Sequence, residues 1–456
     1  MKPNTAKSRS IVRSFAAMSA AGLLVAACGS SAKTSSGTTA AATTAAAGTT
    51  VPAAGTTTAG TMTAGTMTAG TMTAGTMTAG TMTAGTMTAG TVAAGGGALT
   101  GGLKVDTSKC TAPTGQTVKL QLQWVAQSQF AGYYAAAAMG YFKDAGINVN
   151  IVELTDSTVV PVQQVATGAA DFAVSWVPKA LAAREAGAKV TDIAQIFQRS
   201  GTLQVSVKAK GINSSTDFKG KKIGNWGFGN EFEIFAALSK NGLDPAKDVT
   251  LVAQQFDVSG LLNGDIDAIE AMNYNEYAQV LEATNKATGK QYTAADLNVV
   301  SYEKEGVGML QDAIWADQTK LSDPVYCGEA VALVQASLKG WAYCRDNVQA
   351  CRDIVMKQSP KYGGSSHQLW QMNEVNALVW PSPDGAGVID KAAWDQTIKI
   401  SAGTKNDLGK TVLTKDPDPE SYTNDIVTAA TKKLAGTDLV GSSYKKETLT
   451  VSAGGN

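Results

Sequence analysis

Residues 121–151 read QLQWVAQSQFAGYYAAAAMGYFKDAGINVNI, and this stretch decides the fold class. Apolar and polar side chains alternate over 117–125, which predicts a strand. The alanine-rich segment 133–143 predicts a helix, Gly146 is placed to end it, and 147–154 predicts the next strand. This order of strand, helix and strand is typical of a mainly parallel sheet covered by helices.

The same alternation continues along the chain and then begins again after a crossing segment. Residues 203–208 alternate once more and are expected where the chain passes from one lobe to the other. The remaining predicted elements are helix 159–170, strand 171–176, helix 179–188, strand 190–198, the strand–loop–helix unit 218–243, strand 249–255, helix 258–266 and strand 267–274.

The globular part, taken as 110–440, has about 330 residues, more than one hydrophobic core usually serves. We therefore expect two α/β lobes. Ligands of open α/β sheets bind beyond the carboxyl ends of the strands, so two facing lobes would form a ligand cleft. The helical segments 325–358 and 366–379 either complete the second lobe or return to the first.

The N-terminus has the features of an export signal. Residues 1–27 combine a basic start with a short apolar run that ends in Val25-Ala26-Ala27, directly before Cys28. This arrangement resembles the bacterial lipobox, which implies cleavage before Cys28 and lipid attachment to its thiol. Acyl chains there would anchor the protein to a membrane surface. The alternative is an ordinary secretory signal that contains a cysteine.

Two terminal segments lack the composition of a core. Residues 28–109 are mostly Ala, Thr, Gly and Ser, with six consecutive copies of TMTAG at 61–90. Ordering such a chain costs more entropy than burial returns, so we expect a disordered stalk. Residues 441–456 are expected to be a flexible tail. A stalk would also suit an adhesive surface protein.

Charge excludes one class of partner. The chain has 38 basic and 38 acidic residues, and 1–27 contains four of the basic ones and no acidic ones. The mature protein therefore has 34 basic and 38 acidic residues, which gives no electrostatic footprint for nucleic acid. No later apolar run reaches the length of a membrane span.

Four cysteines follow Cys28, an even number that favours disulfides in an exported chain. Cys344 and Cys351 flank RDNVQA, where Asp346-Asn347 could end one helix before the next, and this pair is the preferred bridge. Cys110 and Cys327 would form the other. A zinc site is disfavoured because no CxxC or nearby histidine accompanies the cysteines, so we expect no metal and no cofactor.

Four stretches in order carry a family resemblance, namely 121–151, 163–176, 217–238 and 261–282. Together they resemble solute-binding proteins related to thiamine-pyrimidine synthase, over roughly 117–360. The resemblance implies a two-lobed periplasmic-binding-protein fold of type 2, with the ligand cleft between the lobes. It also implies a receptor whose partners are a small molecule and the permease and ATPase subunits of an ABC importer. The lipobox resemblance adds export and a lipid anchor. Related synthases use an active-site histidine and a cysteine-rich iron motif, so a single histidine without a cysteine cluster, in an exported chain, argues against an enzyme.

The first strand-to-helix loop supplies the first candidate ligand-binding residues. The resemblance would place Trp124, Gln127, Gln129, Phe130 and Tyr133 at the cleft. Core packing is the alternative for such aromatics.

Strand ends supply the other candidates. Trp176 ends strand 171–176, and the alternative for it is also a buried core position. Glu231 could bind the ligand or only favour the dipole of the next helix. The remaining candidates follow predicted strands and are Asn225, Trp226, Gly227, Phe228, Gly229, Asn230, Asn273, Tyr274 and Glu276.

The only histidine, His367, is expected at the surface, and one histidine gives no Ser-His-Asp arrangement. The candidate loops contain no Arg or Lys, which an anion receptor would need. They favour a neutral or amine-bearing heteroaromatic ligand, such as a thiamine pyrimidine precursor or a riboflavin-like vitamin. The alternatives are a receptor for alkanesulfonate, nitrate or taurine, a thiamine-pyrimidine-synthase-like enzyme, and an adhesive surface protein.

Overall fold

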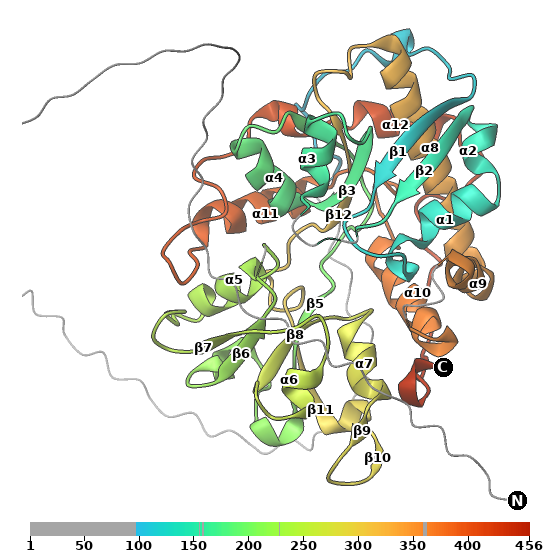
Figure 1. Cartoon of the computed structure of the whole chain (residues 1–456). Helices are drawn as coiled ribbons and strands as arrows, with labels where there is room; N and C mark the ends of the chain where they lie inside the picture. The colour runs from blue at the N-terminus through green and yellow to red at the C-terminus, as the bar shows by residue number, and fades with distance from the viewer. Residues whose placement is uncertain (1–96, 155, 157–158, 228, 359–362) are drawn as a thin grey trace, which may run out of the picture. The chain divides into compact units, whose positions relative to one another are not determined.

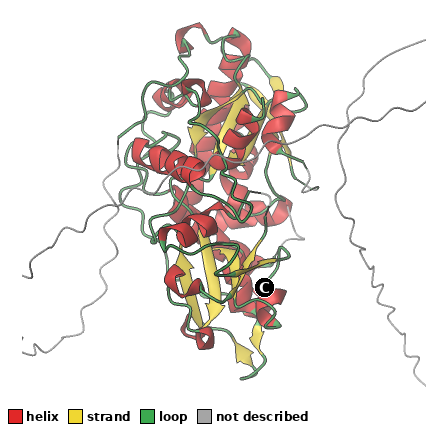
Figure 2. Cartoon of the chain, turned by 90° about the vertical axis from the view of Figure 1, so that its left-hand side faces the viewer, coloured by secondary structure: helices red, strands yellow, loops and turns green. Residues whose placement is uncertain are grey.

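The computed structural model describes residues 97–154, 156, 159–227, 229–358 and 363–456. These residues form two lobes, each built on a five-stranded sheet with helices packed against it (Figures 1 and 2). The predicted two-lobed α/β architecture is therefore confirmed.

The first lobe contains the sheet ordered β2-β1-β3-β12-β4. Four of its strands run in one direction, while β12 is antiparallel to both of its neighbours. The strands are β1 (Gln116–Gln121), β2 (Ile147–Val152), β3 (Phe172–Trp176), β4 (Val190–Gln195) and β12 (Asp312–Asp317).

The second lobe repeats this plan in the order β11-β5-β8-β6-β7. Here β5 is antiparallel to both neighbours, and the other four strands share a direction. The strands are β5 (Thr202–Val207), β6 (Lys222–Asn225), β7 (Thr250–Ala253), β8 (Ala268–Met272) and β11 (Leu297–Ser301). Both sheets are thus mainly parallel, as predicted. A separate hairpin pairs β9 (Thr284–Asn285) with β10 (Lys290–Gln291).

The reversed strand of each sheet is the first one after a crossing between lobes. Residues 196–201 lead from β4 to β5, and residues 302–311 lead from β11 to β12. Because β12 is reversed, its first residue, Asp312, pairs with Trp176, the last residue of β3. The start of β12 therefore lies at the carboxyl edge of the sheet, where ligands of such folds bind.

The alanine-rich composition of the first helix is explained by a close helix contact. Helix α1 (Ala131–Ala138) packs on the long helix α8 (Pro324–Asp346). A Cβ at Gly340 would lie 2.0 Å from the carbonyl oxygen of Gly132, so these helices approach at a distance that only small residues allow. The other helices of this lobe are α2 (Tyr141–Asp144), α3 (Pro161–Ala166), α4 (Val177–Glu185), α9 (Val348–Gln358) and α12 (Asp425–Lys432).

Two helices contact both lobes. Helix α10 (Ser365–Val379) touches the short 3-10 helix η2 (Ser128–Phe130) of the first lobe and α7 of the second, and α11 (Lys391–Gly403) touches α4 and α5. The predicted helical region after residue 324 therefore returns to the first lobe, with α10 between the lobes. The helices of the second lobe are α5 (Phe232–Lys240), α6 (Ser259–Leu262) and α7 (Glu276–Glu282).

The ends of the globular part lie further out than predicted. Residues from 97 onward belong to it, since Leu99 is buried and its N–H donates to the carbonyl of Ile389 at 2.8 Å. At the other end, Val451 is buried and its carbonyl accepts from Gln291 Nε2 at 2.9 Å. The expectation of a free tail over 441–456 is therefore corrected. The signal 1–27 and the repeat region up to residue 96 lie outside the described residues.

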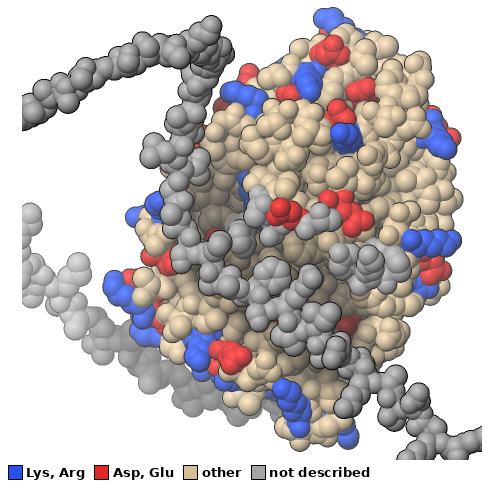
Figure 3. Space-filling model, viewed as in Figure 1, with Lys and Arg blue, Asp and Glu red and all other residues tan. Residues whose placement is uncertain are grey.

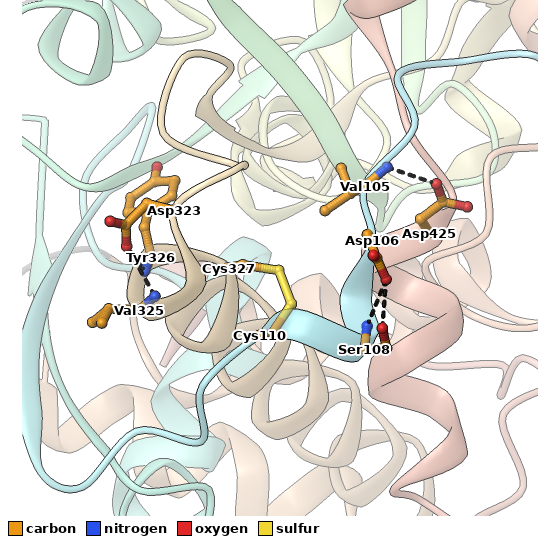
Figure 4. Close-up of a disulfide and its surroundings, with 9 residues drawn as sticks. All are labelled: Val105, Asp106, Ser108, Cys110, Asp323, Val325, Tyr326, Cys327 and Asp425. Atoms are coloured by element: carbon orange, nitrogen blue, oxygen red, sulfur yellow. Dashed lines mark hydrogen bonds between the residues drawn. A yellow bond between two sulfur atoms is a disulfide. The ribbon is translucent and has the colours of Figure 1, made fainter.

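The structure pairs Cys110 with Cys327 (Figure 4) and Cys344 with Cys351, with Cα–Cα distances of 5.1 and 5.2 Å. Both distances suit disulfides. Helix α8 ends at Asp346, with Asn347 as its C-cap, and α9 begins at Val348, as the sequence predicted.

The face shown in Figure 3 carries basic and acidic side chains scattered among one another. Among the described residues, no helix is long and apolar enough to cross a membrane.

Candidate functional site

A cavity of about 650 Å³ lies between the two lobes. Its wall includes the loop after β1, the end of β3 and the start of α4 from the first lobe, and the loops after β6, β7 and β8 from the second. The volume lies in the range of small-molecule sites. The cavity is therefore placed where the family resemblance put the ligand cleft.

Aromatic side chains from both lobes meet in this cavity. Trp124 of the first lobe packs on Phe256 of the second, with ring centroids 4.8 Å apart and ring planes tilted by 52°. Phe256 in turn stacks on Trp226, with centroids 6.1 Å apart. Trp176 and Tyr274 also line the cavity. Such surfaces suit the faces of a flat aromatic ligand.

A buried carboxylate organises the polar side of the cavity. Asp312 Oδ1 accepts from Trp176 Nε1 at 2.9 Å, and Oδ2 accepts from Gln129 Nε2 at 3.1 Å. Gln123 Nε2 donates to the same carboxylate. Burial raises the pKa of Asp312 to about 7, although these donors and Lys179 oppose the rise. Asp312 therefore fixes three side chains of the cavity wall.

A lysine also reaches the cavity. Lys179 on α4 donates to Asn230 Oδ1 of the second lobe at 2.7 Å, and its Nζ lies 4.6 Å from the centre of the Trp176 ring. Burial lowers the pKa of Lys179 to about 8, and the carboxylates of Glu270 and Glu231 oppose this. The loops considered in the sequence contain no cation, but the cavity wall includes Lys179, which directly follows Pro178 at the end of one of those loops.

Most of the candidates from the sequence are brought together. Those that line the cavity are Trp124, Gln127, Gln129, Trp176, Trp226, Gly229, Asn230, Tyr274 and Glu276. They come from loops far apart in the sequence, so their meeting follows from the packing of the two lobes. That these residues bind a ligand remains a proposal.

Two candidates from the first loop do not face the cavity. Phe130 and Tyr133 are buried in the core of the first lobe, where the Tyr133 ring meets Trp341 edge-on at 5.9 Å between centroids. Their placement at the cleft is corrected. The close approach of α1 to α8 brings Tyr133 against Trp341 of α8, whereas Phe130 is buried in η2, just before α1.

Other candidates lie beside the cavity without lining it. Glu231 Oε2 accepts from Gly229 N at 3.0 Å, so it shapes the glycine loop. Asn273 joins neighbouring segments, since its N–H donates to Gly201 O and its carbonyl accepts from Trp370 Nε1. Asn225 and Gly227 are also absent from the described lining. Phe228 and the lipidation candidate Cys28 lie outside the described residues.

Four residues of the cavity region were not predicted from the sequence, namely Asp312, Lys179, Gln123 and Phe256. Lys179 and Gln123 could have been predicted from the sequence, because each lies close to a tryptophan that was predicted for the site. Gln123 directly precedes Trp124, and Lys179 follows Trp176 by three residues. Asp312 carried no such signal, since it begins a strand instead of following one. Phe256 lies after β7, a strand end for which no candidate was proposed.

Known proteins similar to this chain identify its family. The sequence pattern of the NMT1/THI5-like family matches residues 127–350. A riboflavin-binding protein of Chloroflexus aurantiacus is 33% identical over 305 residues, which cover 62% of this chain and 80% of the relative. The chain belongs to the NMT1/THI5-like family.

Other relatives of this NMT1/THI5-like chain fall into two classes. A formylaminopyrimidine-binding protein of Halalkalibacterium halodurans is 21% identical over 288 residues, which cover 62% of this chain and 84% of the relative. A 4-amino-5-hydroxymethyl-2-methylpyrimidine phosphate synthase of Schizosaccharomyces pombe is 30% identical over 157 residues, or 34% of this chain. The match spans only 45% of that synthase.

Among solved structures, a periplasmic sulfonate-binding protein of Methylobacillus flagellatus superposes with a TM-score of 0.50 at 17% identity. The match covers 71% of this chain and 96% of the other. This likeness shows a shared periplasmic-binding-protein fold.

The expectation for the single histidine is corrected by the structure. His367 is buried on α10, not at the surface as expected, and it does not line the cavity. Among the described residues, no cluster of three or more His, Cys, Asp or Glu side chains could hold a metal ion.

Proposed function

We propose that this protein is the extracytoplasmic solute-binding receptor of an ABC importer and that its ligand is a heteroaromatic vitamin or vitamin precursor. The observation that carries the proposal is the cavity of about 650 Å³ between two lobes, with aromatic rings from both. A receptor of this kind binds its ligand at such a cleft and can close around it by hinge motion.

The chemistry of the wall supports an aromatic ligand. Trp124, Trp176, Trp226 and Phe256 offer apolar faces, and the glutamine side chains at 123, 127 and 129 offer donors and acceptors for ring edges. The relatives that bind riboflavin and formylaminopyrimidine support this class. A riboflavin-like vitamin and a thiamine pyrimidine precursor are the two candidates.

An alkanesulfonate, nitrate or taurine is the weaker alternative. Such anions are usually held by arginine or lysine and free N–H groups. Among the described lining residues the cation is Lys179, and its ammonium already donates to Asn230 and lies over Trp176. A cation engaged in this way favours a ligand with neutral acceptor atoms over a small anion.

The proposed function can be tested by calorimetric titration of the purified protein with four compounds, namely riboflavin, formylaminopyrimidine, 4-amino-5-hydroxymethyl-2-methylpyrimidine and taurine. We expect one of the heteroaromatic compounds to bind at one molecule per chain. Mass spectrometry of the released compound should recover it unchanged. A chemically altered compound would show that the protein is an enzyme of the synthase type, and binding of taurine alone would favour the anion alternative.

The anchor needs its own test. The lipid on Cys28 would be the membrane attachment, so Cys28→Ser should move the protein from the membrane fraction to the soluble fraction. Deletion of residues 29–96 is the companion experiment, because a receptor should keep its ligand affinity without the stalk. An adhesive surface protein would instead lose its function with that deletion.

A further inference from the structure

The single histidine of the chain is held between two oxygen atoms of the second lobe. His367 lies on α10, and its side chain is buried. Its Nδ1 is 2.7 Å from Glu282 Oε1, and its Nε2 is 3.0 Å from Asn275 Oδ1. Both partners flank α7, with Asn275 at its N-cap and Glu282 at its last residue.

The orientation of the Asn275 amide fixes the direction of one of these bonds. Asn275 Nδ2 donates to Glu276 Oε1 at 2.7 Å, so its oxygen Oδ1 is the atom that faces the imidazole. Gln279 Nε2 also donates to Oδ1, at 3.4 Å. A carbonyl oxygen only accepts, and therefore His367 Nε2 must carry a proton.

The other ring nitrogen faces a carboxylate. An ionised Glu282 only accepts hydrogen bonds, so His367 Nδ1 must also carry a proton. An imidazole that donates from both nitrogens is the positively charged imidazolium. The geometry therefore describes a buried ion pair between His367 and Glu282.

The hydrogen-bond chain from His367 ends in the cavity wall. Asn275 and Glu276 both line the cavity. Glu276 is held at its second oxygen by Met272 N at 2.9 Å, so the Asn275 amide and this backbone N–H together set its orientation. If Nε2 lost its proton, the Asn275 amide would have to turn over, and its donor would leave Glu276.

Helix α10 also holds the opposite wall. Gln368 Oε1 and Gln371 Oε1 accept from Ser128 N at 2.8 and 2.7 Å. Ser128 lies between Gln127 and Gln129, which line the cavity from the first lobe. One helix therefore fixes the polar walls that the two lobes present to a ligand.

We propose that His367, as an imidazolium, is a positioning residue that holds Asn275 and Glu276 in the orientation that binds the ligand, and that α10 sets this wall against residues 127–129 of the other lobe. The role in ligand binding rests on the proposed function, whereas the protonation of the His367 imidazole does not.

The protonation of the two imidazole nitrogens can be measured without any ligand. Because His367 is the only histidine, nitrogen-15 NMR of protein that carries no histidine tag shows one pair of imidazole signals. We expect both nitrogens to resonate as protonated nitrogens, each correlated to its own proton. A spectrum with one unprotonated ring nitrogen would overturn the proposal.

The positioning role is tested with His367→Gln, which can offer a donor to Glu282 but places a carbonyl near Asn275 Oδ1. We expect the side-chain amide signals of Asn275 to move and the affinity for riboflavin, or for whichever probe the native protein binds, to fall about tenfold or more, in line with the loss of a charge-assisted bond. Ser366→Ala is the matched control, since Ser366 is adjacent but bonds Ser452.

The outcomes separate the two proposals. A folded His367→Gln variant with unmoved Asn275 signals, or with native affinity for a probe that the native protein binds, would overturn the positioning role. If the native protein binds none of the probes, the proposed function fails, and the ring nitrogens and the Asn275 signals still decide whether His367 orients this wall.

Discussion

The indole Nε1 of Trp176 lies 2.9 Å from Asp312 Oδ1, across the antiparallel pair β3–β12 in which these two residues are register partners. This pairing holds an aromatic wall of the cavity to a buried carboxylate at the start of β12, directly after the return crossing between the lobes. The orientation of Trp176 in the cavity wall therefore depends on the residue that follows the return crossing.

Replacing Asp312 with Asn should weaken ligand binding about tenfold or more, because hydrogen bonds to a charged group contribute roughly 1.5–3 kcal/mol. The new amide nitrogen would face the donors of Gln123 or Gln129 and would release Trp176 or a glutamine. Calorimetric titration with the ligand measures this. Asp317→Asn, at the other end of the same strand, is the control and should keep native affinity. Native affinity in Asp312→Asn would show that the carboxylate does not order the site.

Phe256→Ala should weaken ligand binding with little change in melting temperature. The Phe256 side chain is 41% exposed, so little core is lost, but its ring bridges Trp124 and Trp226 across the cavity. An aromatic pair contributes about 0.5–1.5 kcal/mol beyond the buried area. Val299→Ala, at a residue that is 37% exposed on β11, is the matched control. Equal affinities for the two variants would remove Phe256 from the site.

Buried carboxylates should make the protein less stable as the pH rises. Glu233 accepts from Ser200 Oγ and Met309 N, one from each crossing segment, and burial raises its pKa from 4.5 to about 7. The pKa of Asp312 is raised in the same direction, from 3.8 to about 7. A raised pKa in the folded state means that the native protein binds more protons than the unfolded chain. The resulting stability is complete below about pH 4 and is lost as the pH rises to about 7.

Urea unfolding at about pH 5 and pH 8 measures this loss, because a tenfold difference in proton affinity between the folded and unfolded states corresponds to about 1.4 kcal/mol. Glu233→Gln cannot ionise, so the difference in unfolding free energy between the two pH values should shrink by one to a few kcal/mol. Asp416→Asn, at an exposed position, should leave the difference unchanged. An unchanged difference in Glu233→Gln would mean that Glu233 is not the group that titrates.

Removal of the Cys110–Cys327 bridge should cost more stability than removal of Cys344–Cys351. The first pair is separated by 217 residues and the second by 7, and a disulfide that closes a longer loop restricts the unfolded chain more. Unfolding of the two double Cys→Ser variants compares them, with a loss of roughly 2–5 kcal/mol expected for the first. Peptide mapping without reductant should recover both disulfide-linked peptide pairs. Recovery of four free thiols would show that neither disulfide forms.

Much of the candidate site could be predicted because it follows a local rule. Trp176, Trp226 and Tyr274 each come directly after or at the end of a strand whose alternating or buried pattern is visible in the sequence. Parallel strands bring their carboxyl ends to one edge, so residues at those ends meet there without further information. The helix break at Asn347 was equally local.

The sequence by itself thus determined the order of strands and helices from β1 to β8, the helical regions of α8, α9 and α10, the two lobes and several residues at strand ends, but it did not predict β11 or β12. Tertiary structure decided what depends on direction and distance across the chain. The reversal of β12 brings the first residue of that strand, Asp312, to the cavity edge. The close contact of α1 with α8 makes Tyr133 a core residue, and α10 places His367 against α7. Hydrophobic periodicity shows which face of an element is buried, but not which distant residue packs against it.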